Sequence, residues 1–204
     1  MNPAFHSIIV HVLTGALAFG TFAAVGLFLV RFPVGARFRH LAPAADMAAL
    51  WAIWIGTVVS VGGMVSGFAI HSLEASINSP VIRNKISAGL LLILTYGLYL
   101  FLRHRLGPRI WNNDWLAAFA AFLTVAGLHW NVVTNSIGGD VAGVPSGYES
   151  IVRLSGVETR FTYYLPTWTL IAIAAVSVAL LALGLARRSG AGDEEDVRQE
   201  AAEV

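Results

Sequence analysis

The chain has 204 residues, of which 56% are hydrophobic and only 12% are charged, and its formal net charge is +1. It contains no cysteine, which excludes disulfides, thiolate metal sites, iron–sulfur clusters and covalent c-type haem attachment by this chain. Several apolar stretches approach the roughly 20 residues that a helix needs to cross the hydrocarbon layer of a bilayer. The composition therefore indicates an integral membrane protein in contact with lipid, and it gives no sign of a nucleic-acid partner.

Five apolar segments are long enough to be membrane spans. They comprise residues Ile8–Val30, Met47–Ile70, Ile86–Leu102, Trp115–Val133 and Leu165–Leu185. We therefore predict an all-α integral membrane protein, a five-transmembrane-helix bundle over residues 1–188. Residues 189–204 follow it as a flexible acidic tail, because a glycine-containing stretch leads into a run of four carboxylates without a hydrophobic face.

The basic residues are unevenly divided between the two sides of this predicted bundle. Nine of them fall in the connections after spans one and three and in the segment after span five, against four on the other side. Cytoplasmic connections carry the excess of arginine and lysine in membrane proteins. The pattern predicts a multi-pass protein of the inner or plasma membrane, with the N-terminus outside and the C-terminus in the cytoplasm. The inner interface would then be marked by Trp51, Trp54, Trp111 and Trp115.

Three histidines on different spans are predicted to lie in one layer near the outer face. His11 and His129 are each about one turn inside the predicted outer end of their span, and His71 directly follows span two. Neutral imidazole ligates haem iron and copper, so these residues are candidate metal ligands, with ordinary interfacial histidines as the alternative. His6 is expected at or just beyond the outer surface. No predicted span contains Asp, Glu, Lys or Arg, which disfavours proton-coupled transport and ion pumping.

Span two carries a stripe of small residues on one helix face. Gly56, Gly63 and Gly67, together with Ser60, follow one another at four- and three-residue spacing. Such a stripe favours close packing against a neighbouring helix. The alternative is that the stripe makes room for a flat macrocycle or a quinone ring against the backbone.

The five spans, the histidine layer of His11, His71 and His129, and the glycine stripe together resemble the small membrane-anchored b-type cytochromes. Those proteins are four- or five-helix bundles that hold haem between histidines on neighbouring helices and pass electrons between quinones and a partner protein. The resemblance implies one haem b near the outer face, with two of the three histidines as axial ligands. It departs from the two-haem members of such families, because the inner half of this bundle has no histidine pair.

A long outer connection, residues 134–164, separates spans four and five. It opens with residues 135–140, which have the composition of turns, and residues 147–154 could form a short interfacial helix. Loops of this length are usually functional or carry structure of their own. We expect it to cap the histidine layer or to dock an external redox protein, with a plain linker as the alternative.

The leading hypothesis is a membrane subunit of a respiratory or electron-transfer complex. It would bind a b-type haem near the outer face and relay electrons between quinone or haem and an external partner. The alternative is a non-catalytic anchor or assembly subunit of a larger membrane complex, and the second alternative is histidine-based copper handling. Hydrolase signatures are missing and no catalytic residue is predicted, so an electron-transfer or accessory subunit is favoured over a stand-alone enzyme.

Overall fold

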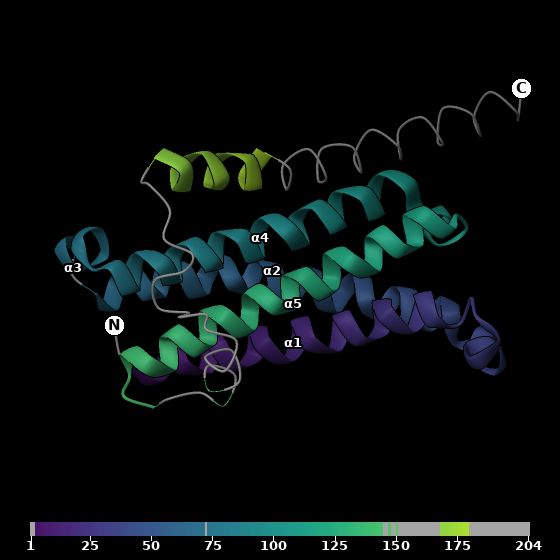
Figure 1. Ribbon diagram of the computed structural model, residues 1–204, viewed down its shortest axis with the longest axis horizontal. Helices are drawn as coiled ribbons and strands as arrows, with labels where there is room; N and C mark the ends of the chain where they lie inside the picture. The colour runs from purple at the N-terminus through teal and green to yellow at the C-terminus, as the bar shows by residue number, and fades with distance from the viewer. Residues whose placement is uncertain (1–2, 72, 145–146, 148–149, 151–167, 180–204) are drawn as a thin grey trace, which may run out of the picture.

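The computed structural model describes residues 3–71, 73–144, 147, 150 and 168–179, and the secondary structure of these residues is entirely helical. The elements in chain order are α1 (Pro3–Leu29), the 3-10 helix η1 (Pro33–Leu41), α2 (Ala42–Ile70), α3 (Leu73–Asn78), α4 (Pro80–Leu106), the 3-10 helix η2 (Gly107–Trp111) and α5 (Asp114–Val141). A further apolar helix comprises Trp168–Ala179 and lies on the α4 side of the bundle (Figure 1).

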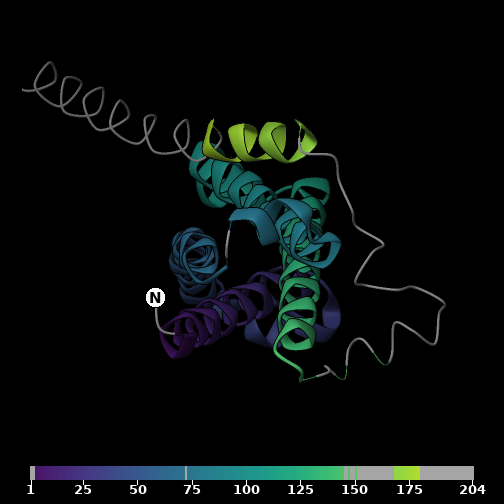
Figure 2. The same ribbon diagram turned by 90° about the vertical axis from the view of Figure 1, so that its left-hand side faces the viewer.

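Helices α1, α2, α4 and α5 run lengthwise beside one another as an antiparallel bundle, which Figure 2 shows end-on. Within the described residues these four helices are long and apolar enough to cross a membrane. We call the end at which α1 and α4 begin the N-terminal end, and the end that carries η1 and η2 the opposite end. The all-helical class is thus confirmed, and four of the five predicted spans correspond to helices long and apolar enough to cross a membrane.

Local sequence explains where α4 and α5 begin and end. Ser79 precedes α4, and its hydroxyl accepts a hydrogen bond from Ile82 N at 3.4 Å, while Pro80 occupies the first turn, where its missing N–H costs nothing. Gly107, with φ of 59°, ends α4 because a left-handed residue cannot continue the helix. Asn113 then caps α5 by accepting hydrogen bonds from Trp115 N and Leu116 N at 3.0 and 3.1 Å.

The two largest differences from the predicted boundaries of the long helices lie at the N-terminal end of the bundle. Helix α4 begins six residues before Ile86, and α5 continues eight residues beyond Val133. The segment 135–140, predicted as turns, is therefore helical, and this prediction was wrong. Asn135 of this segment faces the bundle, where its Nδ2 donates a hydrogen bond to Thr14 Oγ1 of α1 at 2.9 Å. Of the fifth predicted span the described part is helical, while residues 151–167 and the acidic tail lie outside the described residues.

The glycines of α2 let α1 approach closely. A methyl group at Gly56 would come within 2.5 Å of Leu17, and one at Gly63 within 3.2 Å of Leu13. Gly20 of α1 meets α2 in the same way, because a methyl group there would lie 2.6 Å from the side chain of Ile53. The interpretation of the glycine stripe as a helix-packing surface therefore applies to Gly56 and Gly63, which pack against leucines of α1.

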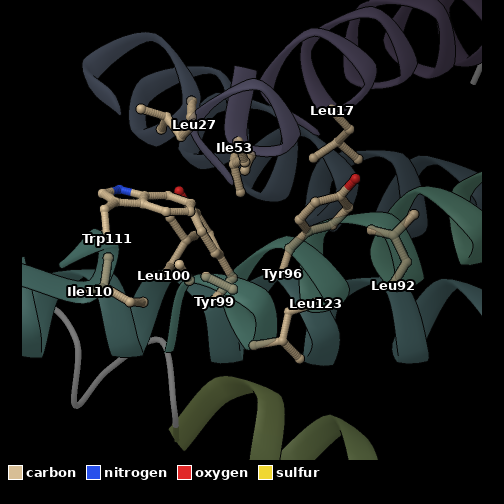
Figure 3. Close-up of a cluster of buried hydrophobic side chains, with 14 of the residues drawn as sticks. Leu17, Leu27, Ile53, Leu92, Tyr96, Tyr99, Leu100, Ile110, Trp111 and Leu123 are labelled. Carbon is tan, nitrogen blue, oxygen red and sulfur yellow. The ribbon is translucent and has the colours of Figure 1, made fainter. Parts of the chain in front are cut away.

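A cluster of leucine and aromatic side chains fills the middle of the bundle and its opposite end (Figure 3). Tyr96 and Tyr99 of α4 are fully buried in it. The Tyr96 hydroxyl forms a hydrogen bond of 2.8 Å with Thr21 Oγ1, which also donates to Thr124 O at 3.2 Å, so this network joins α1, α4 and α5. The Tyr96 ring lies directly on Gly127, where a methyl group would approach it to 2.6 Å.

Candidate functional site

The four histidines of the predicted outer region lie at different depths. His71 directly follows α2, and His6 is in the first turn of α1. His11 lies about 12 Å along α1 from its beginning, at 1.5 Å per residue, whereas His129 lies roughly 18 Å before the end of α5. The single layer predicted from the span boundaries does not hold, because α5 extends far beyond the predicted end of span four.

His11 and His129 both lie on the outside of the bundle. The side chain of His11 is exposed, and its Nδ1 lies 2.7 Å from Ser7 O. His129 is also exposed, and its ring packs edge-on against Trp130 with centroids 5.2 Å apart. The structure therefore does not bring these two imidazoles together with His71. Within the described ranges, no group of three His, Cys, Asp or Glu residues is placed to hold a metal ion.

His6 is the histidine that packs against a neighbouring helix. Its Nδ1 lies 2.7 Å from Ser66 Oγ of α2, and the Ser66 hydroxyl in turn donates to Gly63 O at 2.9 Å. Because that hydroxyl proton is already engaged, His6 Nδ1–H is the donor to Ser66, which leaves Nε2 as the second ring position. The ring covers Gly67, at 3.6 Å from where a methyl group would lie, and is within electrostatic range of His71 and Lys85.

Lys85 brings a cation to the same end from α4. Its side chain is only partly exposed and lies against α5 at Gly138. A methyl group added to Gly138 would be 3.1 Å from Lys85 Nζ. The ion pairs Arg31–Asp114 and Arg103–Asp46 lie at the opposite end of the bundle, and among the described residues no carboxylate is within ion-pair distance of Lys85. We call His6, Ser66, His71 and Lys85 the N-terminal-end cluster.

Buried amides and hydroxyls continue this cluster toward the middle of the bundle. Asn84, Ser87, Asn131 and Ser136 are all buried between α4 and its neighbours. Asn135 Nδ2 donates to Thr14 Oγ1 at 2.9 Å and lies 3.2 Å from Asn131 Oδ1, and the buried Asn131 Nδ2 has no hydrogen-bond partner. Buried polar groups are normally satisfied, so the unused N–H of Asn131 is a candidate contact for a ligand.

The residues of this chain do not by themselves fit a haem between spans one, two and four. Axial ligation needs two imidazoles that face each other across the macrocycle. His11 and His129 instead face outward at different depths, and the glycine stripe that would have made room is covered by Leu13, Leu17 and His6. We therefore assign no haem to the interior of the bundle.

Charged residues inside the long helices were missed in the sequence. At the opposite end, Asp46 of α2 and Arg103 of α4 form a buried ion pair. Asp46 Oδ1 accepts from Arg103 Nε at 2.9 Å and from the Trp111 indole Nε1 at 2.7 Å. Trp111, predicted at the membrane interface, is buried because its indole N–H bonds this carboxylate. Asp46, Lys85 and Arg103 each lie one position outside the predicted spans Met47–Ile70 and Ile86–Leu102, but inside the longer helices α2 and α4.

Comparison of the chain with protein-family models, with curated proteins and with solved structures gave no match.

Proposed function

We propose that the chain crosses the plasma membrane five times, with the N-terminal end of the bundle outside. Two observations support this topology: the opposite end carries six arginines and two aspartates within the described residues, and Trp168–Ala179 supplies an apolar fifth helix. Single cysteines can test it cleanly because the chain has none. Asn78→Cys should react with an impermeant maleimide in intact cells, and Asn112→Cys and a C-terminal cysteine only after permeabilisation. Any other pattern overturns the topology.

We infer that the function of the chain is to bind an anionic group at the N-terminal-end cluster, as a binding subunit of a membrane complex rather than as a stand-alone enzyme. The observation that carries this proposal is Lys85, a partly buried ammonium with no described carboxylate within ion-pair distance. An ionisable residue within a membrane helix is a functional candidate because it is expensive to keep there. A bound anion would supply the missing counter-charge.

The groups around Lys85 favour the same kind of ligand. The imidazoles of His6 and His71 lie within electrostatic range of one another, and the Asn131 amide offers an unused N–H deeper in the bundle. Phosphate and carboxylate oxygens only accept hydrogen bonds, and charge-assisted bonds to them are about twice as strong as neutral ones. A phosphate or carboxylate head group therefore matches the Lys85 ammonium and the Asn131 amide better than a neutral ligand does.

Thermal unfolding of the full-length protein in phosphatidylcholine nanodiscs tests the proposal. We expect added inorganic phosphate, or added phosphatidylglycerol, to raise the unfolding temperature of the wild type, since a ligand at 100 times its Kd stabilises by about 2.7 kcal/mol. Lys85→Gln should abolish the shift caused by inorganic phosphate and reduce the shift caused by phosphatidylglycerol, since the arginines of the opposite end still attract acidic lipid. Arg105→Gln, an exposed residue at the other end of α4, removes the same charge and should leave the shift intact. Equal shifts of the wild type and of Lys85→Gln with inorganic phosphate, and equal shifts of the two with phosphatidylglycerol, would refute the site.

The two probes distinguish the source of the anion. A response to inorganic phosphate identifies a soluble ligand that reaches the cluster from outside. A response to phosphatidylglycerol alone that is smaller in Lys85→Gln identifies a lipid head group at the cluster. Loss of either response in Lys85→Gln supports the proposal, whereas no response to either probe in the wild type overturns it for phosphate-bearing ligands.

An electron-transfer subunit is the second candidate, and one observation favours it. A carbonyl only accepts hydrogen bonds, so His11 Nδ1–H donates to Ser7 O at 2.7 Å, and Nε2 is left on the outer surface of α1. Imidazoles that ligate metals are commonly oriented by such a bond through the other ring nitrogen. His11 is thus suited to contribute one ligand to a haem b that is held mainly by another subunit.

A dithionite-reduced minus oxidised spectrum of the complex, isolated with its native partners, tests this candidate. We expect a b-type α band that is lost in His11→Ala and retained in His40→Ala, a control histidine that is exposed at the opposite end. A flat spectrum of the intact complex would rule out the redox function and leave the anion-binding function unaffected.

A further inference from the structure

A second surface at the opposite end of the bundle combines cations with exposed apolar side chains. Helix η1 connects α1 to α2, and four large hydrophobic residues in and next to it remain 44–78% exposed: Phe32, Val34, Phe38 and Leu41. Arg37, Arg39 and His40 of the same element are exposed as well. Such an arrangement is unfavourable in water but suits the boundary between lipid head groups and acyl chains.

Contacts with the end of α1 hold η1 in its conformation, so the exposed surface of η1 has a defined structure. Arg39 Nε donates to Val30 O at 3.1 Å, which satisfies a carbonyl that the last turn of α1 leaves without a helical partner. Phe32 packs edge-on against Phe28 of α1, with centroids 5.2 Å apart. The guanidinium of Arg37 lies over the ring of Phe38, 4.6 Å from its centroid.

The carboxylates described at this end are already engaged. Asp46 is buried against Arg103, and Asp114 pairs with Arg31. The neighbouring arginines of η1, α4 and η2 therefore leave an excess of positive charge beside the exposed phenylalanines. Exposed tryptophans at the same end, Trp51 and Trp115, are the residues that mark a bilayer interface.

We propose that η1 is an interfacial anchor that inserts Phe32, Val34 and Phe38 into the membrane and binds acidic phospholipid head groups through Arg37. The apolar side chains decide between lipid and the other acidic candidate, the C-terminal run of carboxylates at residues 193–196. That run has no hydrophobic side chain with which to cover the phenylalanines, whereas a leaflet supplies both acyl chains and phosphates. This surface is separate from the N-terminal-end cluster and does not depend on it.

A spin label at Val34→Cys in the full-length protein measures the depth of η1, with Asn112→Cys, an exposed polar position, as the water-accessible reference. In nanodiscs we expect the label at position 34 to favour oxygen over a water-soluble relaxant. Its depth should increase as phosphatidylglycerol replaces phosphatidylcholine. Equal water accessibility at the two positions would overturn the insertion.

Matched charge variants test the role of Arg37 in the Val34→Cys background. Arg37→Gln should raise the phosphatidylglycerol fraction needed for half of the depth change about fivefold, which corresponds to the roughly 1 kcal/mol that one cation contributes at an acidic surface. Lys85→Gln, at the other end, should not change it. An equal effect of Arg105→Gln would show general surface charge instead of recognition by η1. A large increase in depth on deletion of residues 189–204 would show that the tail covers η1, and would likewise overturn the proposal.

Discussion

Removal of the Asp46 carboxylate is expected to destabilise the bundle more than any surface change. Asp46 and Arg103 are each only 6% exposed, and the carboxylate accepts hydrogen bonds from the Arg103 guanidinium and from the Trp111 indole. In Asp46→Ala the guanidinium stays buried without its counter-charge, which typically costs about 3–5 kcal/mol. The lost acceptor for the indole N–H is part of the same network, so the two costs do not simply add.

Reversible unfolding in mixed micelles of dodecyl maltoside and dodecyl sulfate, followed by circular dichroism, measures this loss. Asp114→Ala is the matched control, because its ion pair with Arg31 involves a side chain that is 87% exposed and should contribute about 0–1 kcal/mol. The double variant Asp46→Leu/Arg103→Met removes both charges and should recover most of the stability, since apolar replacement of a buried pair is often neutral. A loss below about 1 kcal/mol in Asp46→Ala, or no recovery in the double variant, would refute an uncompensated charge as the cause.

Three further changes test the packing of the long helices by the same unfolding assay. Gly127→Ala should cost about 1–3 kcal/mol, because its methyl group would come within 2.6 Å of the Tyr96 ring. The control Gly15→Ala should be neutral or slightly stabilising, because its methyl group would have no atom within 4 Å. Equal effects of the two substitutions would contradict the close approach of Tyr96 to Gly127. Tyr96→Phe removes the 2.8 Å bond to Thr21 and should cost about 1 kcal/mol, and Thr21→Val should cost less in that background than alone, because only its bond to Thr124 O is then left to lose. Asn113→Ala removes the cap of α5 and should cost about 0.5–2 kcal/mol, an effect that Asn113→Asp should not show.

Hydrophobicity alone located the long helices. It did not locate where they begin or terminate on the N-terminal side of the bundle. Helix α4 starts at Pro80, although Arg83, Asn84 and Lys85 interrupt the apolar pattern there. Such residues resemble a loop only while their surroundings are unknown. In the structure Asn84 is fully buried and Lys85 crosses α5, so tertiary packing, which a local window does not contain, keeps them helical.

The histidine prediction depended on those ends. The prediction ended span four at Val133, which placed His129 near the outer surface. The helix in fact continues, and Asn135 beyond Val133 faces the bundle, where it bonds Thr14. His6, which was assigned to the surface, instead meets Ser66 of α2, 60 residues away in sequence. The same holds for Asp46 and Arg103, whose contact joins positions 57 residues apart. No spacing rule relates such pairs; only the helix packing does.

Lys85 differs from the aspartates and arginines that pair at the opposite end of the bundle, and this contrast bears on what Lys85 is for. At the opposite end each described aspartate is paired with an arginine, whereas Lys85 has no described carboxylate within ion-pair distance. A partly buried ammonium without such a partner costs stability, and residues kept at such a cost commonly serve function. Lys85→Met, which keeps the aliphatic stem, should therefore stabilise the protein in phosphatidylcholine by about 1 kcal/mol and abolish its response to anions. If Lys85→Met instead destabilises the protein while the response persists, the lysine is a structural residue and the anion must bind elsewhere.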